Sequence, residues 1–219
     1  MKRLLALLFL LVTGCMPDSN APRFLALGDS YTIGEGVAPE ARWPNVVAAQ
    51  LRASGAEIAD PEIIAVTGWT TDELDAGIDA ANPSGSYALV TLLVGVNNQY
   101  RERPLAEYRE QFRALLGRAV GFAGGEPHRV VVVSIPDWGV TPFGSEDARG
   151  PEEIARQIDA FNAIAQGETE SAGAVWADIT PLSRTQGGLT VGDGLHPTGE
   201  AYAAWAGLLL PLAREVAAL

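Results

Sequence analysis

Short, nearly unbroken apolar runs recur along the chain, separated by longer segments of mixed polarity. Five of these runs stand out, at residues 24–27, 63–66, 89–96, 130–133 and 174–177. Continuous apolar runs of this kind are typical of strands buried on both faces of a parallel sheet. The pattern therefore predicts a five-stranded parallel sheet.

Helical spacing follows several of these runs. Apolar residues recur three or four positions apart over 105–119, 154–165 and 202–216, which predicts helices with one buried face. Alternation of strands and helices predicts an α/β domain with helices on both faces of the sheet and right-handed crossovers. Ligands of such sheets bind beyond the carboxyl ends of the strands, so we expect the chemistry there.

After residue 22 the sequence has no second linker, repeat or low-complexity block, and we expect one domain over 23–219. A chain of 219 residues is consistent with a single core. Loops at 28–36, 136–151 and 187–194 are long or glycine-rich, and long loops in compact domains are often functional. Whether 136–151 moves as a lid is not decided by the sequence.

The first residues have the pattern of a cleaved signal peptide. Lys2 and Arg3 precede an apolar run over 4–12, which is shorter than the roughly 20 residues of a spanning helix. The small residues before Cys15 resemble the lipobox of bacterial lipoproteins, in which the cysteine is lipidated and becomes the first residue. We expect a signal peptide over 1–14, a tether over 15–22 and an extracytoplasmic protein anchored through Cys15. The alternative is an ordinary secretory signal and a secreted soluble protein.

Charge and cysteine content exclude several function classes. The chain has 15 basic and 27 acidic residues, a net charge of −12, and one cysteine. This balance argues against a protein that follows nucleic-acid phosphates, and one cysteine excludes an intrachain disulfide or a thiolate cluster. Loss of Lys2 and Arg3 on cleavage would make the charge −14. Anionic headgroups would repel such a body, so only the lipid on Cys15 would hold it at a membrane.

Candidate chemistry is concentrated in one serine and one histidine. Ser30 lies shortly after the first apolar run, where a helix N-terminus would stabilise a developing negative charge. His196 lies three residues after Asp193 and just before the last helical segment. Taken alone, Asp29 and Ser30 are also explained as a helix cap, and Asp193 and His196 as turn and helix-entry residues. The other histidine, His128, precedes the fourth run and is interpreted as a solvated loop residue.

Together these residues resemble the SGNH, or GDSL-like, serine hydrolases. The common G-x-S-x-G elbow is absent from the sequence. Instead, four blocks stand in that family's order over about residues 23–219: Gly28-Asp29-Ser30, Gly68 after the second run, Gly95-Val96-Asn97-Asn98, and Asp193 with His196. The resemblance implies a three-layer α/β/α, flavodoxin-like fold. It also implies an esterase that needs no metal or organic cofactor.

The resemblance assigns roles position by position. Ser30 would be the nucleophile, His196 the general base, and Asp193 the acid that orients the imidazole. The oxyanion hole would consist of the Ser30 and Gly68 backbone N–H groups and the Asn97 side-chain amide. Asn98 stands where the family has aspartate, and we expect this difference to affect local support rather than the reaction.

The expected function is a serine esterase that hydrolyses carboxylic esters through an acyl-enzyme on Ser30, with short-chain acyl or acetyl esters favoured. Candidate lining residues of the substrate site are Trp69, Tyr100, Trp138 and Phe143. The remaining tryptophans, Trp43, Trp176 and Trp205, are interpreted as core. The expected partners are small-molecule, glycan or lipid esters, with no nucleic acid, and the protein is expected to be a monomer. Two alternatives stay open: a lysophospholipase or thioesterase for longer chains, and a non-catalytic glycan- or protein-binding lipoprotein on the same scaffold.

Overall fold

Five parallel strands form the centre of the computed structural model, which describes residues 21–217. They are β1 (Phe24–Gly28), β2 (Glu62–Ala65), β3 (Leu89–Leu93), β4 (Val130–Val133) and β5 (Val175–Ala177). Their order across the sheet is β2-β1-β3-β4-β5. This order reverses direction after β2, as in flavodoxin-like sheets. The predicted fold class is confirmed.

The strands differ in burial according to their place in the sheet. Every residue of the central strands β1, β3 and β4 is buried, as predicted. The outer strands β2 and β5 are only partly buried, because each has a neighbouring strand on one side alone. Trp176, expected in the core, is therefore half-buried in β5.

Four of the five apolar runs do not coincide at both ends with the strands they predicted, and the second and third differ most. The second strand begins and ends one residue earlier than its apolar run, and Val66, just beyond it, is 46% exposed. The third run continues past the end of β3 into the helix α4 (Val96–Tyr100). Between them Gly95 has a φ of +131°, a conformation that glycine adopts readily and other residues rarely do. Apolarity alone did not show where this strand ends, because the residues beyond it are also buried.

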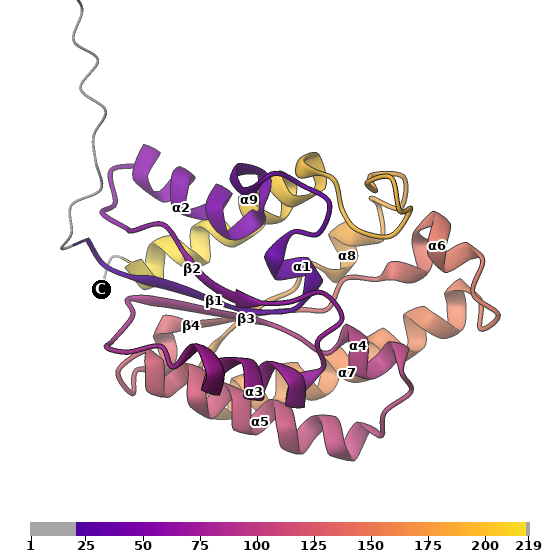
Figure 1. Cartoon of the computed structure of the whole chain (residues 1–219), viewed down its shortest axis with the longest axis horizontal. Helices are drawn as coiled ribbons and strands as arrows, with labels where there is room; N and C mark the ends of the chain where they lie inside the picture. Colours follow the sequence, from indigo (N-terminus) through magenta and orange to yellow (C-terminus); the bar gives the residue numbers. More distant parts are fainter. Residues whose placement is uncertain (1–20, 218–219) are drawn as a thin grey trace, which may run out of the picture.

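Helices cover both faces of the sheet (Figure 1). On one face lie α2 (Trp43–Ala53) and α9 (Gly199–Ala217), and on the other lie α3 (Thr71–Ala81), α5 (Leu105–Phe122) and α7 (Pro151–Ala172). The three helices predicted from apolar spacing are α5, α7 and α9. Trp43 and Trp205, both expected in the core, are each 1% exposed, and their helices α2 and α9 pack against each other. None of the helices within 21–217 is both long and apolar enough to cross a membrane.

Short helices lie where the chain leaves the carboxyl ends of the strands. They are α1 (Ser30–Ile33), α4, α6 (Pro142–Ser145) and α8 (Thr180–Ser183), with two 3-10 helices, η1 (Pro39–Ala41) and η3 (Trp138–Val140). A further 3-10 helix, η2 (Pro127–Arg129), directly precedes β4 and so lies at the amino end of that strand. In Figure 1 these four short α-helices lie toward one end of the molecule.

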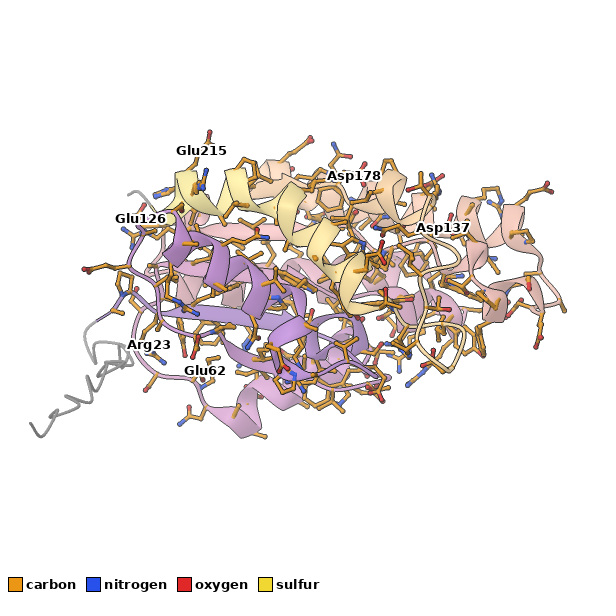
Figure 2. The ribbon with its side chains drawn as sticks, turned by 90° about the horizontal axis from the view of Figure 1, so that it is seen from above. Arg23, Glu62, Glu126, Asp137, Asp178 and Glu215 are labelled. Carbon is orange, nitrogen blue, oxygen red and sulfur yellow. The ribbon has the colours of Figure 1, made fainter. Side chains whose placement is uncertain are left out.

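The segment 136–151 is more ordered than its sequence suggested, since it contains η3 and α6. Its beginning is held by Asp137, whose Oδ2 accepts a hydrogen bond from Arg184 Nε at 2.8 Å. Its middle is joined to the loop before α9, because Phe143 N donates to Gly194 O at 2.9 Å. Figure 2 places Asp137 toward the opposite end of the molecule from Arg23, where β1 begins.

Candidate active site

Ser30 is the first residue of α1, separated from the strand β1 by Asp29 alone. Asp29 is the N-cap of this helix, and its Oδ1 accepts a hydrogen bond from Tyr31 N at 3.1 Å. Capping therefore accounts for Asp29, while Ser30 stands at the helix start with its side chain toward a pocket. The turn requires Gly28, since a Cβ there would collide with Leu93 O of the neighbouring strand.

His196 and Asp193 form a close hydrogen-bonded pair. His196 Nδ1 and Asp193 Oδ2 are 2.6 Å apart. Asp193 Oδ1 accepts from the backbone N–H groups of Leu195 at 2.8 Å and His196 at 3.0 Å. Partial burial raises the pKa of Asp193, but the hydrogen bonds from the imidazole and the two amides outweigh it and lower the pKa overall. The carboxylate is thus ionised at neutral pH and favours a proton on Nδ1, which leaves Nε2 free as a base.

Gly68 occupies a tight turn after β2. Trp69 N donates to Val66 O at 3.2 Å, and Gly68 has a φ of +88°, which is typical of the third residue of a type II turn. Asn97 lies on α4, and its Nδ2 donates to Trp69 O at 2.8 Å. An amide nitrogen carries two hydrogens, so one N–H joins Asn97 to the turn and the other is available to a ligand.

One pocket brings the predicted residues together. It has a volume of about 190 Å³ and is lined by Ser30, Gly68, Asn97 and His196 together with Tyr31, Thr67, Val96, Tyr100, Trp138, Phe143 and Leu195. These residues follow β1, β2, β3 and β4 or belong to the loop before α9, so the site lies at the predicted edge of the sheet. Ser30 is 4% and His196 9% exposed. Within residues 21–217, no hydrogen bond joins Ser30 Oγ to His196; catalytic contacts often tighten only when substrate binds.

Three of the four expected lining residues form an aromatic wall. The ring centroids of Tyr100 and Trp138 are 5.5 Å apart, and those of Trp138 and Phe143 are 5.9 Å apart. Trp138 is fixed from behind, since its Nε1 donates to Gln99 Oε1 at 2.8 Å.

The fourth expected lining residue, Trp69, is not among the residues that line this pocket. Its ring packs against α3 so closely that a Cβ on Gly77 would collide with it. The backbone of Trp69 still serves the site, through the hydrogen bond from Asn97. A sequence position next to Gly68 therefore did not decide which way the indole points.

Other residues of the site were not found from the sequence. Tyr31, Thr67, Val96 and Leu195 line the pocket, and each adjoins a predicted site residue, which was the available signal. Arg149 was also missed: its guanidinium lies 5.1 Å from the Trp138 ring centroid, within the usual range of a cation–π contact. No local pattern marks Arg149, because only the fold brings it to the aromatic wall.

Asn98 directly follows Asn97 in α4. It is fully buried, its Oδ1 accepts from Thr71 N at 3.0 Å, and its Nδ2 donates to Thr71 Oγ1 at 2.7 Å. These bonds join α4 to the start of α3. The residue is not among those that line the pocket, and its expected supporting role stays a prediction.

Three further expectations fall outside this pocket. His128 lies in η2 with 43% of its side chain exposed, as expected of a solvated residue. Cys15 and the signal peptide lie outside the described residues, so their roles stay predictions. Among residues 21–217 there is no cluster of three His, Cys, Asp or Glu side chains suited to a metal ion.

Comparison with known proteins adds a family and several similar folds. The model of the GDSL-like lipase/acylhydrolase family matches residues 26–204. No curated protein matches the chain. The solved structure of TesA is similar, with a TM-score of 0.71 and 18% identity over 89% of this chain and 99% of that one.

Two further structures are similar at comparable identity. The lipase/acylhydrolase from Enterococcus faecalis has a TM-score of 0.65 and 21% identity, covering 90% of this chain and 96% of its own. A variant of Axe2, an acetyl xylan esterase from Geobacillus stearothermophilus, has a TM-score of 0.64 and 16% identity, covering 88% and 94%. At these identities the likeness shows the fold alone.

Proposed function

Because the chain belongs to the GDSL-like lipase/acylhydrolase family and is thus an ester-bond hydrolase, we propose that it is a serine esterase acting through an acyl-enzyme on Ser30. The observation that carries this proposal is the convergence of Ser30, His196 and both further oxyanion donors on one pocket. The 2.6 Å contact between His196 Nδ1 and Asp193 supports the role of His196 as the base.

The proposed reaction has two halves. His196 Nε2 takes the Ser30 proton as Oγ attacks the ester carbonyl, and the oxyanion is bound by the Ser30 N–H, the Gly68 N–H and Asn97 Nδ2. The tetrahedral intermediate collapses, and His196 gives its proton to the leaving alcohol. Water then attacks the acyl-enzyme, again with His196 as base, and releases the acid and the free serine.

Pocket size supports a preference for short acyl groups, acetyl included. The volume of about 190 Å³ is little more than that of an engineered cavity of about 150 Å³ that holds benzene. The aromatic wall of Tyr100, Trp138 and Phe143 bounds the pocket. A longer acyl chain would have to leave this space and lie across Tyr100 and Phe143, which are 45% and 38% exposed. That exposed apolar rim favours long-chain esters as the second candidate.

Hydrolysis of p-nitrophenyl esters from acetate to laurate tests the proposal. Ser30→Ala should lower kcat by at least about 10³-fold. Ser145→Ala should leave it unchanged, because Ser145 Oγ donates to Pro142 O of its own short helix and Ser145 is not among the residues that line the pocket. An optimum at acetate to hexanoate supports the short-chain preference, and one at decanoate or beyond refutes it. A folded protein that neither hydrolyses these esters nor reacts with a fluorophosphonate at Ser30 would instead be a binding module.

We further propose that the protein is extracytoplasmic and anchored by a lipid on Cys15. The described chain enters β1 at Phe24, at the end of the sheet opposite the pocket. A tether joined there would leave the pocket open to substrate. Cys15→Ser should move the protein from the membrane fraction to the soluble fraction; an unchanged distribution would refute the anchor.

A further inference from the structure

Arg101 connects the two elements that carry the oxyanion donors. It caps the C-terminus of α4, the helix that bears Asn97, and its N–H bonds to Asn97 O at 3.1 Å. Its guanidinium Nη2 reaches back to the turn after β2 and donates to Gly68 O at 2.7 Å. Arg101 thus contacts the residues on both sides of the proposed oxyanion hole, Asn97 through its backbone N–H and Gly68 through its guanidinium.

Glu73 holds the other end of the guanidinium. Arg101 Nη1 lies 3.2 Å from Glu73 Oε1, and Glu73 Oε2 accepts from Thr70 N at 2.9 Å in the capping box of α3. The hydrogen bond from the Thr70 backbone, together with those from the Thr70 hydroxyl and Arg101, outweighs partial burial and lowers the pKa of Glu73. The carboxylate is therefore charged opposite Arg101 at neutral pH.

We propose that Arg101 is a positioning residue that sets the place of the Gly68 N–H relative to the Asn97 amide. The inference rests on the proposed esterase function and adds a residue that the family resemblance does not assign.

Apart from the hydrogen bond that Trp69 O accepts from Asn97 Nδ2, the turn is fixed by few contacts of its own, so the contact from Arg101 to Gly68 O adds to its definition. Gly68 has no Cβ and adopts a φ of +88°, in a region where glycine has wide conformational freedom. The turn's own hydrogen bond, from Trp69 N to Val66 O, measures 3.2 Å, at the long end of the usual range. Oxyanion donors must lie within about 0.5 Å of their productive positions, which this turn does not secure alone.

The exposure of the Arg101–Glu73 pair distinguishes a role in positioning the Gly68 N–H from a role in stabilising the fold. The side chains of Arg101 and Glu73 are 43% and 40% exposed, and ion pairs at such exposure contribute little to folding. Loss of Arg101 should therefore leave the protein folded while shifting the Gly68 donor. Displacement of one donor should cost less than its removal, which typically lowers kcat by about 10²–10³-fold.

Arg103 provides a matched control. It lies two residues further along the chain and pairs with the neighbouring carboxylate of α3, with Nη1 at 2.6 Å from Asp72 Oδ1. It also pairs with Glu107 at 3.3 Å, but no hydrogen bond joins it to Gly68 within the described residues. Its replacement removes a similar charge from the same helix start and leaves the Gly68 carbonyl contact in place.

The experiment compares the wild type with Arg101→Ala, Arg101→Lys and Arg103→Ala on the best p-nitrophenyl ester. Arg101→Ala should lower kcat by about 10- to 100-fold, with KM within about twofold of the wild type and an unchanged melting temperature. Fluorophosphonate labelling of Ser30 should slow in parallel. Millimolar guanidinium should restore part of the lost activity, Arg101→Lys should lose less, and Arg103→Ala should behave as wild type.

Three results would overturn the inference. The first is a kcat of Arg101→Ala that equals that of Arg103→Ala. The second is a rise in the KM of Arg101→Ala with no change in kcat, which would make Arg101 a substrate contact. The third is a loss of kcat in Arg101→Ala and in Arg103→Ala that parallels the unfolding of both variants. If Arg101→Ala is unfolded, the kcat values of Arg101→Lys and Glu73→Gln are compared with that of Arg103→Ala instead. Each of these results leaves the Ser30-dependent esterase intact, whereas a wild type without Ser30-dependent hydrolysis would overturn the proposed function and this inference together.

Discussion

Replacing Asp29 by asparagine should stabilise the protein at alkaline pH and not at acidic pH. The side chain is fully buried, one residue before Ser30 in the chain. Its Oδ1 caps α1 through Tyr31 N, but its Oδ2 has no hydrogen-bond partner among the described residues. Burial raises the pKa of this carboxyl from 3.8 to about 7, against the smaller opposing effect of its backbone hydrogen bonds.

The sign and size of the effect follow from linkage. The folded state binds the Asp29 proton more tightly than the unfolded state, so stability falls as pH rises from about 4 to about 7 and is level above that. At about 1.36 kcal/mol per pH unit, this loss reaches roughly 4 kcal/mol. Asparagine stays neutral and keeps the cap, but its Nδ2 replaces an oxygen that has no partner, at a cost of about 1–3 kcal/mol. The net gain is about 1–3 kcal/mol at pH 8.

Urea unfolding of wild type and Asp29→Asn at pH values from 4 to 8 measures this difference. Asp137→Asn is a control for which the opposite effect is expected. The Asp137 side chain is also buried but is paired with Arg184 at 2.8 Å, so its neutralisation should destabilise the protein at pH 8. The reasoning is refuted if Asp29→Asn changes the free energy of unfolding by the same amount at every pH, or destabilises the protein at pH 8.

Three further predictions concern the site and its support. Asp193→Asn should lower kcat by roughly 10²–10⁴-fold with little change in melting temperature, since it loses the ionised partner of His196; steady-state kinetics at pH 8 measure this. Trp69→Leu should cost about 1–3 kcal/mol in urea unfolding but leave KM unchanged, and a large rise in KM would restore Trp69 to the substrate site. Asn98→Asp would bury a carboxyl beside Thr71, so it should destabilise the protein more at pH 8 than at pH 5 while kcat stays the same. An equal loss of unfolding free energy, relative to wild type, at both pH values would contradict this.

The loops show where prediction from the sequence ended. Glycine content and length marked 136–151 and 187–194 as functional, but not their internal structure or their mutual contact. The hydrogen bond from Phe143 N to Gly194 O joins them, across a separation of about fifty residues. No local pattern encodes such a contact, because it depends on how β4 and α9 are placed by the rest of the fold.

The sequence by itself determined the sheet, three of the helices that cover it (α5, α7 and α9) and the order of the site residues. Apolar runs and helical spacing are local patterns with a direct physical cause, since each describes which face of an element is buried. The place of Ser30, Gly68 and Asn97 followed from the same logic, because parallel strands bring their carboxyl ends to one edge. These features need no knowledge of which side chains meet.

Only the tertiary structure decided which side chains of different elements contact one another. Trp69 adjoins Gly68 in sequence and yet packs on α3, while Arg149 lies at the far end of the loop 136–151 and yet stands over the Trp138 ring near its start. Arg101 reaches Gly68 O for the same reason, since α4 and the turn meet only in the folded chain. Side-chain direction at a loop depends on competing contacts from several elements, and those contacts exist only once the sheet and its helices are assembled.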